Sequence, residues 1–149
     1  DGDLENNRAA RSLVYFVAKF PGVKIYFVSA STQKMKPDIL EHLRENKVSF
    51  YESEDLREVI PRVDAVYMLR TQREFGSVVY DMNGDVLVLD TKKASLAKES
   101  AIFMHPLPID SRVSEIRKEV ESDPRAVFLT DEIDSGMFTR MALLKMGIF

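Results

Sequence analysis

Two short stretches of the sequence carry groups that can hold an anion next to a polar ligand. The first is RTQR, in which Arg70 and Gln72 alternate and therefore lie on the same side of an extended backbone. A guanidinium beside a carboxamide presents several N–H donors in one plane, an arrangement that suits a carboxylate. Taken alone, an Arg-x-Gln is more typical of a surface arginine paired with a glutamate. Its position after an apolar run puts the binding interpretation on an equal footing.

The second stretch is AIFMHPLP, in which four apolar residues are followed by His105, Pro106, Leu107 and Pro108. Each proline fixes φ, removes an N–H and biases the preceding residue to an extended conformation. The carbonyls of so stiff a loop have few internal donors and can accept hydrogen bonds from a ligand. For the lone histidine, capping a strand is a more typical role than catalysis.

Arg8 is a third candidate. It lies in the first turn of a predicted helix, where the helix dipole does not favour a basic side chain. This unfavourable position suggests another role for Arg8, such as binding an anion. Arg11 is close by, and both could equally be solvated. Two arginines beside a rim of carbonyl acceptors suit a substrate that bears carboxylates together with an amide or amine.

The elements that must position these residues alternate along the chain. Apolar periodicity and turn residues predict helices over residues 8–20, 37–45, 54–60, 91–98, 111–120 and 124–144, and strands over 23–28, 48–51, 63–69, 86–89 and 101–104. Short, apolar strands that alternate with helices favour an α/β fold with a mostly parallel sheet covered on both faces. Ligands of such sheets bind beyond the carboxyl ends of the strands, where RTQR and HPLP follow.

Finer expectations concern caps and inward faces. We expect Asn6 or Asn7 to cap the first helix and Ser53 the third. We expect a long loop with some helix over residues 71–85, and a possible break of the last helix at Gly136. The predicted inward residues are Leu13, Phe16, Val17 and Phe20, then Ile39, Leu40 and Leu43, then Leu56, Val59 and Ile60, then Val113, Ile116 and Val120.

Composition excludes several classes of protein. The chain has 149 residues, the size of one domain, and its 24 acidic against 21 basic residues give a net charge of −3, which does not favour a nucleic-acid binder. No apolar run approaches the roughly 20 residues that cross a bilayer. The absence of cysteine and the presence of only two histidines argue against disulfides and a metal site, and fit a reducing cytoplasm.

Five segments in a fixed order resemble the aspartate-binding half of aspartate carbamoyltransferase. The family patterns are approximately GDL-x-x-GRTVHSL, Y-x-x-R-x-Q-x-E, MHPLPR, SDPRA and NGM-F-x-RMALL. The corresponding segments are GDLENNRAARSL (2–13), YMLRTQRE (67–74), MHPLP (104–108), SDPRA (122–126) and SGMFTRMALL (135–144). The resemblance covers nearly the whole chain. It implies a three-layer, Rossmann-like domain with a mostly parallel sheet of about four to five strands, and residues 1–149 as one aspartate-binding domain.

The resemblance implies a role for each candidate residue. Arg8 and Arg70 would hold the two carboxylates of L-aspartate, with Gln72 assisting, and Leu107 and Pro108 would offer backbone carbonyls to the amide of carbamoyl phosphate. His105, Pro106 and Arg112 would be structural near the site. The family reaction, a step of pyrimidine biosynthesis, joins these two substrates into N-carbamoyl-L-aspartate and phosphate without cofactor or metal, in a cytoplasmic homotrimer. We expect no catalytic residue in this chain, because the family's phosphate loop and mobile lysine lie in an N-terminal domain whose motif is absent here.

The sequence departs from the family at several positions: Asn7, Ala9 and Arg11 replace glycine, threonine and histidine, Ile109 stands where arginine is expected, and Ser135 replaces asparagine. An insertion of three residues would make Arg112 the displaced arginine. A non-catalytic domain that binds an amino acid or a partner is therefore an alternative. An ornithine carbamoyltransferase is disfavoured because that branch carries cysteine in HCLP, and a nicotinamide enzyme because no G-x-G-x-x-G follows a strand.

Overall fold

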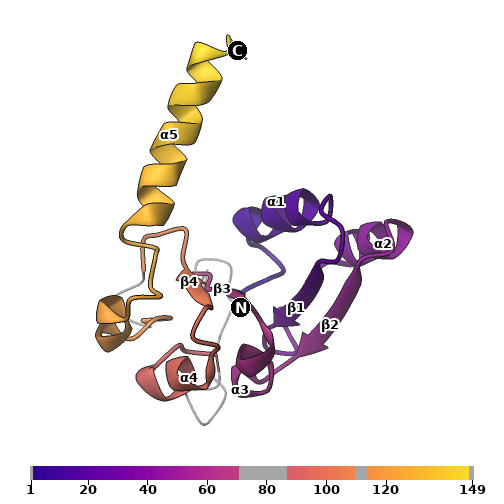
Figure 1. Ribbon diagram of the computed structural model, residues 1–149. Helices are drawn as coiled ribbons and strands as arrows, with labels where there is room; N and C mark the ends of the chain where they lie inside the picture. The colour runs from indigo at the N-terminus through magenta and orange to yellow at the C-terminus, as the bar shows by residue number, and fades with distance from the viewer. Residues whose placement is uncertain (1, 71–86, 110–113, 148–149) are drawn as a thin grey trace.

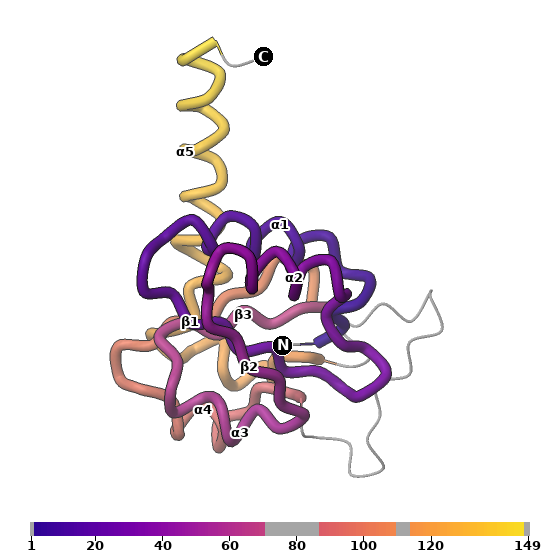
Figure 2. The backbone as a smooth tube through the Cα atoms, turned by 90° about the vertical axis from the view of Figure 1, so that its right-hand side faces the viewer, coloured from indigo at the N-terminus to yellow at the C-terminus, as the bar shows by residue number. Residues whose placement is uncertain are grey.

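The computed structural model describes residues 2–70, 87–109 and 114–147. Within these residues the elements follow one another as α1 (Arg8–Val17), β1 (Lys24–Val28), α2 (Pro37–Glu45), β2 (Ser49–Ser53), α3 (Leu56–Val59), η1 (Ile60–Arg62), β3 (Ala65–Tyr67), α4 (Thr91–Leu96), β4 (Ile102–Met104), η3 (Lys118–Ser122) and α5 (Asp131–Lys145). Figure 1 shows helices on both faces of the strands, with α1 and α2 on one side and α3 and α4 on the other. The view turned by 90° keeps these three layers apart (Figure 2). The α/β prediction is confirmed.

All the described strands pair in parallel, but they form two pairs rather than one continuous sheet. β1 pairs with β2, from Lys24 opposite Ser49 to Val28 opposite Ser53. β3 pairs with β4, from Ala65 opposite Ile102 to Tyr67 opposite Met104. The backbone around Ala126 runs parallel to Phe103 as an isolated bridge on the other side of β4.

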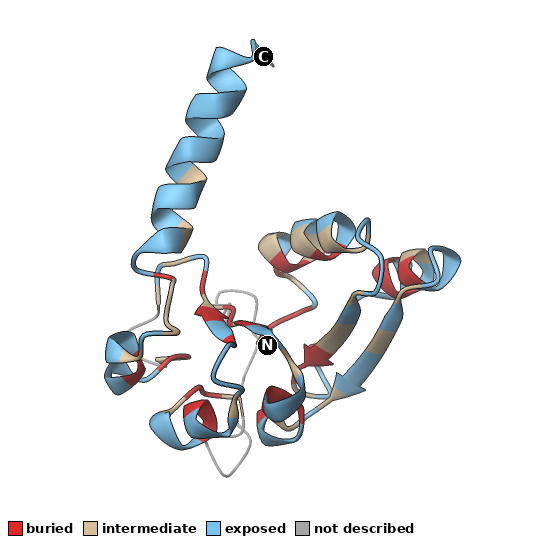
Figure 3. Ribbon diagram, viewed as in Figure 1, coloured by how far each residue is buried: buried red, intermediate tan, exposed pale blue. Residues whose placement is uncertain are grey.

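The core has two parts, and β1 contributes a buried residue to each of them. The first core joins α1, α2 and β1 through residues such as Val14, Ile39 and Leu43. The second joins α3, α4, β3 and β4 around Phe103, with Phe128 fully buried against them. Figure 3 shows the buried residues on the strands and on the inner faces of these helices, while α5 is exposed almost throughout.

Several sequence predictions were right at the level of single residues. The predicted helix over residues 37–45 is α2, and its expected inward residues Ile39, Leu40 and Leu43 are all buried. The side chain of Asn7 accepts a hydrogen bond from the Ala10 N–H and so caps α1 as expected. The break of the last helix expected at Gly136 was wrong, because α5 runs through that residue without interruption.

Other predictions were wrong. The buried residues of α1 are Ala10 and Val14, whereas Phe16 and Phe20 are more than half exposed. Asp55, not Ser53, caps α3. In place of a helix over residues 111–120, the described part has a parallel bridge between Leu89 and Ile116 and the short helix η3. Ile116 and Val120 are nevertheless buried, as predicted.

The last helix begins at Asp131, later than expected. The predicted loop over residues 71–85 lies outside the described residues, as do Val86 and Val113.

Candidate functional site

The candidate site lies beyond the carboxyl ends of β3 and β4. Tyr67 and Met104 are register partners at the ends of these strands, and the Met68 N–H donates to the Met104 carbonyl across 2.9 Å. The chain therefore leaves both strands at the same edge. Arg70 follows one strand by a few residues and the His105–Pro108 turn follows the other directly. The structure thus brings Arg70 and the His105–Pro108 turn to the same edge of the strands.

The His105–Pro108 turn is held by its own imidazole. His105 is 1% exposed, and its Nδ1 accepts a hydrogen bond from the Leu107 N–H across 2.9 Å. Because Nδ1 is the acceptor, the proton of the neutral ring must sit on Nε2, which is buried without a hydrogen-bond partner among the described residues. Burial lowers the pKa of His105 to about 4. A buried imidazole that stays neutral is suited to orienting a turn rather than to exchanging protons with a ligand.

Leu107 has a backbone conformation that leucine rarely adopts. Its φ is +49°, in the left-handed region, and its peptide bond to Pro108 is cis. A left-handed, non-glycine residue costs free energy and persists only where its surroundings impose it, which is common at ligand sites. Here the Leu107 side chain packs against the second core, together with that of Ile109. Ile109, at the position of the expected arginine, therefore has a packing role.

Arg8 begins α1 and is exposed, with no ion-pair partner among the residues that the structure describes. Arg70 is half-buried. The chain that leads into α1 contacts the residue before Arg70, because a Cβ at Gly2 would lie 2.8 Å from the Leu69 carbonyl oxygen, so only glycine fits there. Gly2 also has a φ of +121°, which glycine tolerates best. Gln72 and Arg112 lie outside the described residues.

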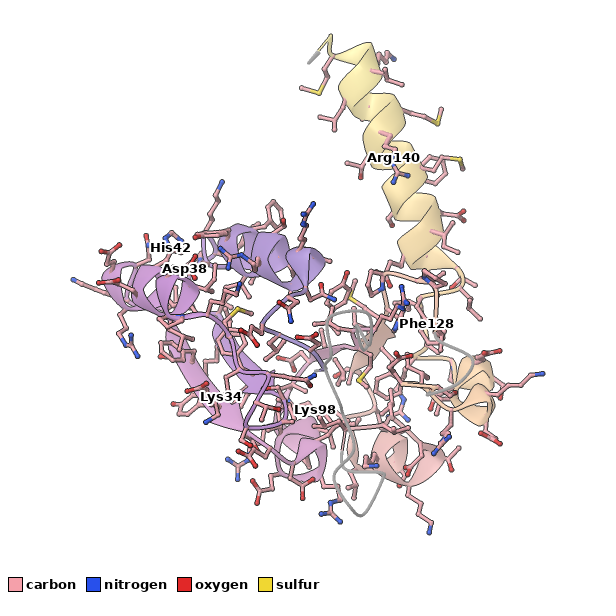
Figure 4. All side chains as sticks on the ribbon, turned by 180° about the vertical axis from the view of Figure 1, so that it is seen from behind. Lys34, Asp38, His42, Lys98, Phe128 and Arg140 are labelled. Atoms are coloured by element: carbon pink, nitrogen blue, oxygen red, sulfur yellow. The ribbon has the colours of Figure 1, made fainter. Side chains whose placement is uncertain are left out.

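The entry to α1 contains a buried carboxylate. Asp3 is fully buried, and its Oδ1 accepts a hydrogen bond from the Asn6 N–H across 3.2 Å. Arg11, which replaces the family's histidine, donates to Asp38 of α2 across 2.6 Å and lowers the pKa of that carboxyl group. Figure 4 shows Asp38 on α2 near α1. Arg11 is therefore engaged in joining the two helices.

Sequence reasoning gave no role to Arg125. Its guanidinium pairs with Asp123 at 2.7 Å, lies 4.9 Å from the centre of the Phe103 ring, and donates to the carbonyls of Ala94 and Lys98 at 3.0 and 3.2 Å. It thus satisfies carbonyls at the end of α4. The SDPRA segment by itself does not indicate these partners, since the carbonyls lie about 30 residues away in sequence.

Other kinds of site find no support in the described parts of the chain. No group of three or more histidine, aspartate or glutamate side chains could hold a metal ion there. None of the helices there is long and apolar enough to cross a bilayer. One depression of about 370 Å³ lies between the ends of α1 and α2 and the starts of β1 and β2, at the strands' amino ends rather than at the candidate site.

Comparison with known proteins gives a consistent result. Residues 2–146 match the family model "Aspartate/ornithine carbamoyltransferase, Asp/Orn binding domain". The chloroplastic aspartate carbamoyltransferase of Arabidopsis thaliana is 45% identical over 148 residues, which cover 97% of this chain and 37% of that protein. The catalytic subunit of M. Jannaschii aspartate transcarbamoylase superposes with a TM-score of 0.84 at 33% identity, over 97% of this chain and 46% of that one. The Trypanosoma cruzi enzyme in complex with aspartate and phosphate gives a TM-score of 0.82 at 31% identity. The chain thus spans less than half the length of these relatives.

Proposed function

Because the chain belongs to the aspartate/ornithine carbamoyltransferase family, we propose that it is the L-aspartate-binding half of an aspartate carbamoyltransferase. The observation that carries the proposal is the common edge of β3 and β4, from which Arg70 and the His105–Pro108 turn emerge together. The left-handed Leu107 within that turn supports it, since such strain is typical of ligand sites. The relatives named above are aspartate carbamoyltransferases, which also supports the proposal.

The proposed reaction joins two anions. The neutral amine of L-aspartate attacks the carbamoyl carbon of carbamoyl phosphate and a tetrahedral species forms. Phosphate then leaves with the electrons of the broken C–O bond and takes up the proton that the amine loses. Arg8 and Arg70, with Gln72 assisting, hold the carboxylates of aspartate. The carbonyls of Leu107 and Pro108 accept hydrogen bonds from the carbamoyl amide. Catalysis is then mostly juxtaposition and charge stabilisation, which needs no acid–base residue or metal from this chain.

In this proposal, the remaining residues of the active site come from outside this chain. An N-terminal domain supplies the phosphate loop, and the intact enzyme is a cytoplasmic homotrimer. The Arabidopsis relative is a chloroplastic protein. We therefore expect the 149-residue chain by itself to show no carbamoyl transfer. Formation of carbamoyl aspartate above the level of an Arg70→Ala control would contradict this.

The decisive experiment is an NMR titration of the chain with succinate and, separately, with alanine. A pair of arginines prefers the dicarboxylate, with a dissociation constant on the order of millimolar because the site is open to water. Arg70→Ala should abolish binding. Arg62→Ala, which removes an exposed arginine of η1, is the matched control and should bind as the unchanged chain does. Equal loss in both variants, or unchanged binding in Arg70→Ala, would show that the site assignment is wrong.

A further inference from the structure

The first turn of α5 contains three carboxylates, and one of them contacts the candidate site. Asp131 and Asp134 are exposed, whereas Glu132 is half-buried. Oε2 of Glu132 accepts a hydrogen bond from the backbone N–H of His105 across 3.0 Å. This contact joins α5 to the first residue of the turn that follows β4.

Glu132 also lies close to the end of β3. Burial raises the pKa of Tyr67, and the negative charge of Glu132 raises it further. Tyr67 and Met104 end the two paired strands, so the Glu132 carboxylate stands where both strands end. Burial raises the pKa of Glu132 itself, while the hydrogen bond from His105 opposes that rise. Keeping the Glu132 carboxylate half-buried costs free energy. Its place in the first turn of α5 does not by itself explain that cost.

Two hydrogen bonds in series connect α5 to the proposed ligand-binding carbonyls. Glu132 accepts from the His105 N–H, and the His105 imidazole accepts from the Leu107 N–H. From this geometry we infer that Glu132 is a positioning residue, which ties the base of α5 to the His105–Pro108 turn and so sets the direction of the Leu107 and Pro108 carbonyls. The ligand of those carbonyls rests on the proposed function, but the tie itself does not.

The tie depends on an acceptor oxygen at the end of a side chain of this length, not on charge. Glutamine offers the same oxygen in the same place without a buried charge, so Glu132→Gln should preserve the tie. Alanine removes the acceptor, and aspartate is one methylene too short to reach. Asp134→Ala is the matched control, because it removes a carboxylate from the same helical turn without touching His105.

Amide hydrogen exchange of the 149-residue chain, followed by NMR, tests the inference without any ligand. In Glu132→Ala, the amides of His105 and Leu107 should both exchange about tenfold faster, the effect of losing one hydrogen bond. Glu132→Gln and Asp134→Ala should exchange as the unchanged chain does. The amide of Leu43, buried in α2, serves as the reference for any global loss of stability.

Two results would overturn the inference. Faster exchange at His105 with unchanged exchange at Leu107 would show that the tie stops at the first hydrogen bond. A glutamine variant that exchanges as fast as the alanine variant would show that an acceptor is not what matters. If Glu132→Ala fails to fold, Glu132→Asp gives the same comparison. Succinate binding is measured separately, so failure here leaves the proposed function standing, and the reverse also holds.

Discussion

The Leu107 N–H donates to Nδ1 of His105 across 2.9 Å, and this bond closes the turn on itself. The imidazole is fully buried, so the turn is fixed from the inside and its outer surface stays available. Pro106 and Pro108 are exposed on that outer side. The role of the histidine in HPLP is therefore to hold the conformation of the turn.

Replacing His105 should separate hydrogen bonding from packing. His105→Ala removes the acceptor and leaves a cavity, and should lower the free energy of unfolding by about 2 to 4 kcal/mol. His105→Asn keeps an acceptor oxygen near the position of Nδ1 and should lose about half as much. Urea unfolding followed by far-UV circular dichroism at pH 7 measures both. Equal losses would mean that the hydrogen bond to Leu107 contributes nothing.

Stability should fall between neutral and mildly acidic pH because of His105. Burial lowers its pKa from 6.5 to about 4, so the folded chain binds fewer protons than the unfolded chain in that window. The corresponding stability is complete above pH 6.5 and is lost as pH falls through 4, by a total of about 3 kcal/mol. Glu132, whose pKa is raised, acts in the opposite sense, so Glu132→Gln should steepen the decline.

Unfolding experiments at pH 7 and pH 5 isolate this effect. Asp38 and Asp123, whose pKa values are lowered by arginine partners, lose their contributions only as pH falls below their ordinary value of 3.8. His105→Asn should abolish the loss of stability at pH 5 and leave the opposite effect of Glu132. His42→Asn, which changes the other histidine, should retain that loss. A loss of stability at pH 5 that survives in His105→Asn would assign the pH dependence to another group.

Arg125→Lys should destabilise the chain although the charge is kept. A lysine ammonium cannot reach Asp123, the Phe103 ring and the carbonyls of α4 together, since these contacts use the planar fork of the guanidinium. We expect a loss of about 2 kcal/mol in unfolding free energy, with Arg62→Lys unchanged as the control. A thermal melt is sufficient. A lysine variant as stable as its parent would reduce Arg125 to an ordinary surface arginine.

Substitutions on α5 beyond its first turn should hardly affect folding of this chain. None of its described residues is buried, and Phe138 and Met141 are 61% and 57% exposed. Met141→Lys should therefore change the unfolding free energy by less than about 0.5 kcal/mol, whereas Phe128→Ala at the base of the helix should cost about 3 to 5 kcal/mol. A large loss in Met141→Lys would show that the helix packs on this chain or a second copy in solution, which sedimentation velocity would distinguish.

The parts of the fold that could be predicted are those decided locally. α2 has proline in its first turn and one apolar face, so its bounds and its buried residues follow from the sequence. α1 has apolar residues on more than one face, and only the contacts with α2 and β1 decide that Val14 is inside and Phe16 outside. The segment around Ile116 has helical spacing, but pairing with Leu89 competes successfully for its backbone.

The candidate site likewise has features that local sequence predicts and features that depend on distant contacts. The turn could be predicted from its prolines, and Arg70 from its place after a strand. The bond from His105 to Leu107 spans only two residues, so a role in orienting the turn was within reach of the sequence. The partner of Glu132 lies 27 residues away, and nothing in the sequence around α5 distinguishes Glu132 from its acidic neighbours. Contacts of that range become visible only when the strands and the last helix are placed together.

The exposed helix α5 also has the geometry of a lever. Its 15 residues, at about 1.5 Å each, make an arm about 22 Å long. Figure 4 shows Phe128 at the base of this arm and Arg140 far along it, clear of the other elements. A tilt of about 10° would carry the tip about 4 Å but would move Glu132, in the first turn, by less than about 1 Å. A displacement of the tip is therefore reduced several-fold before it reaches Glu132 and the His105–Pro108 turn.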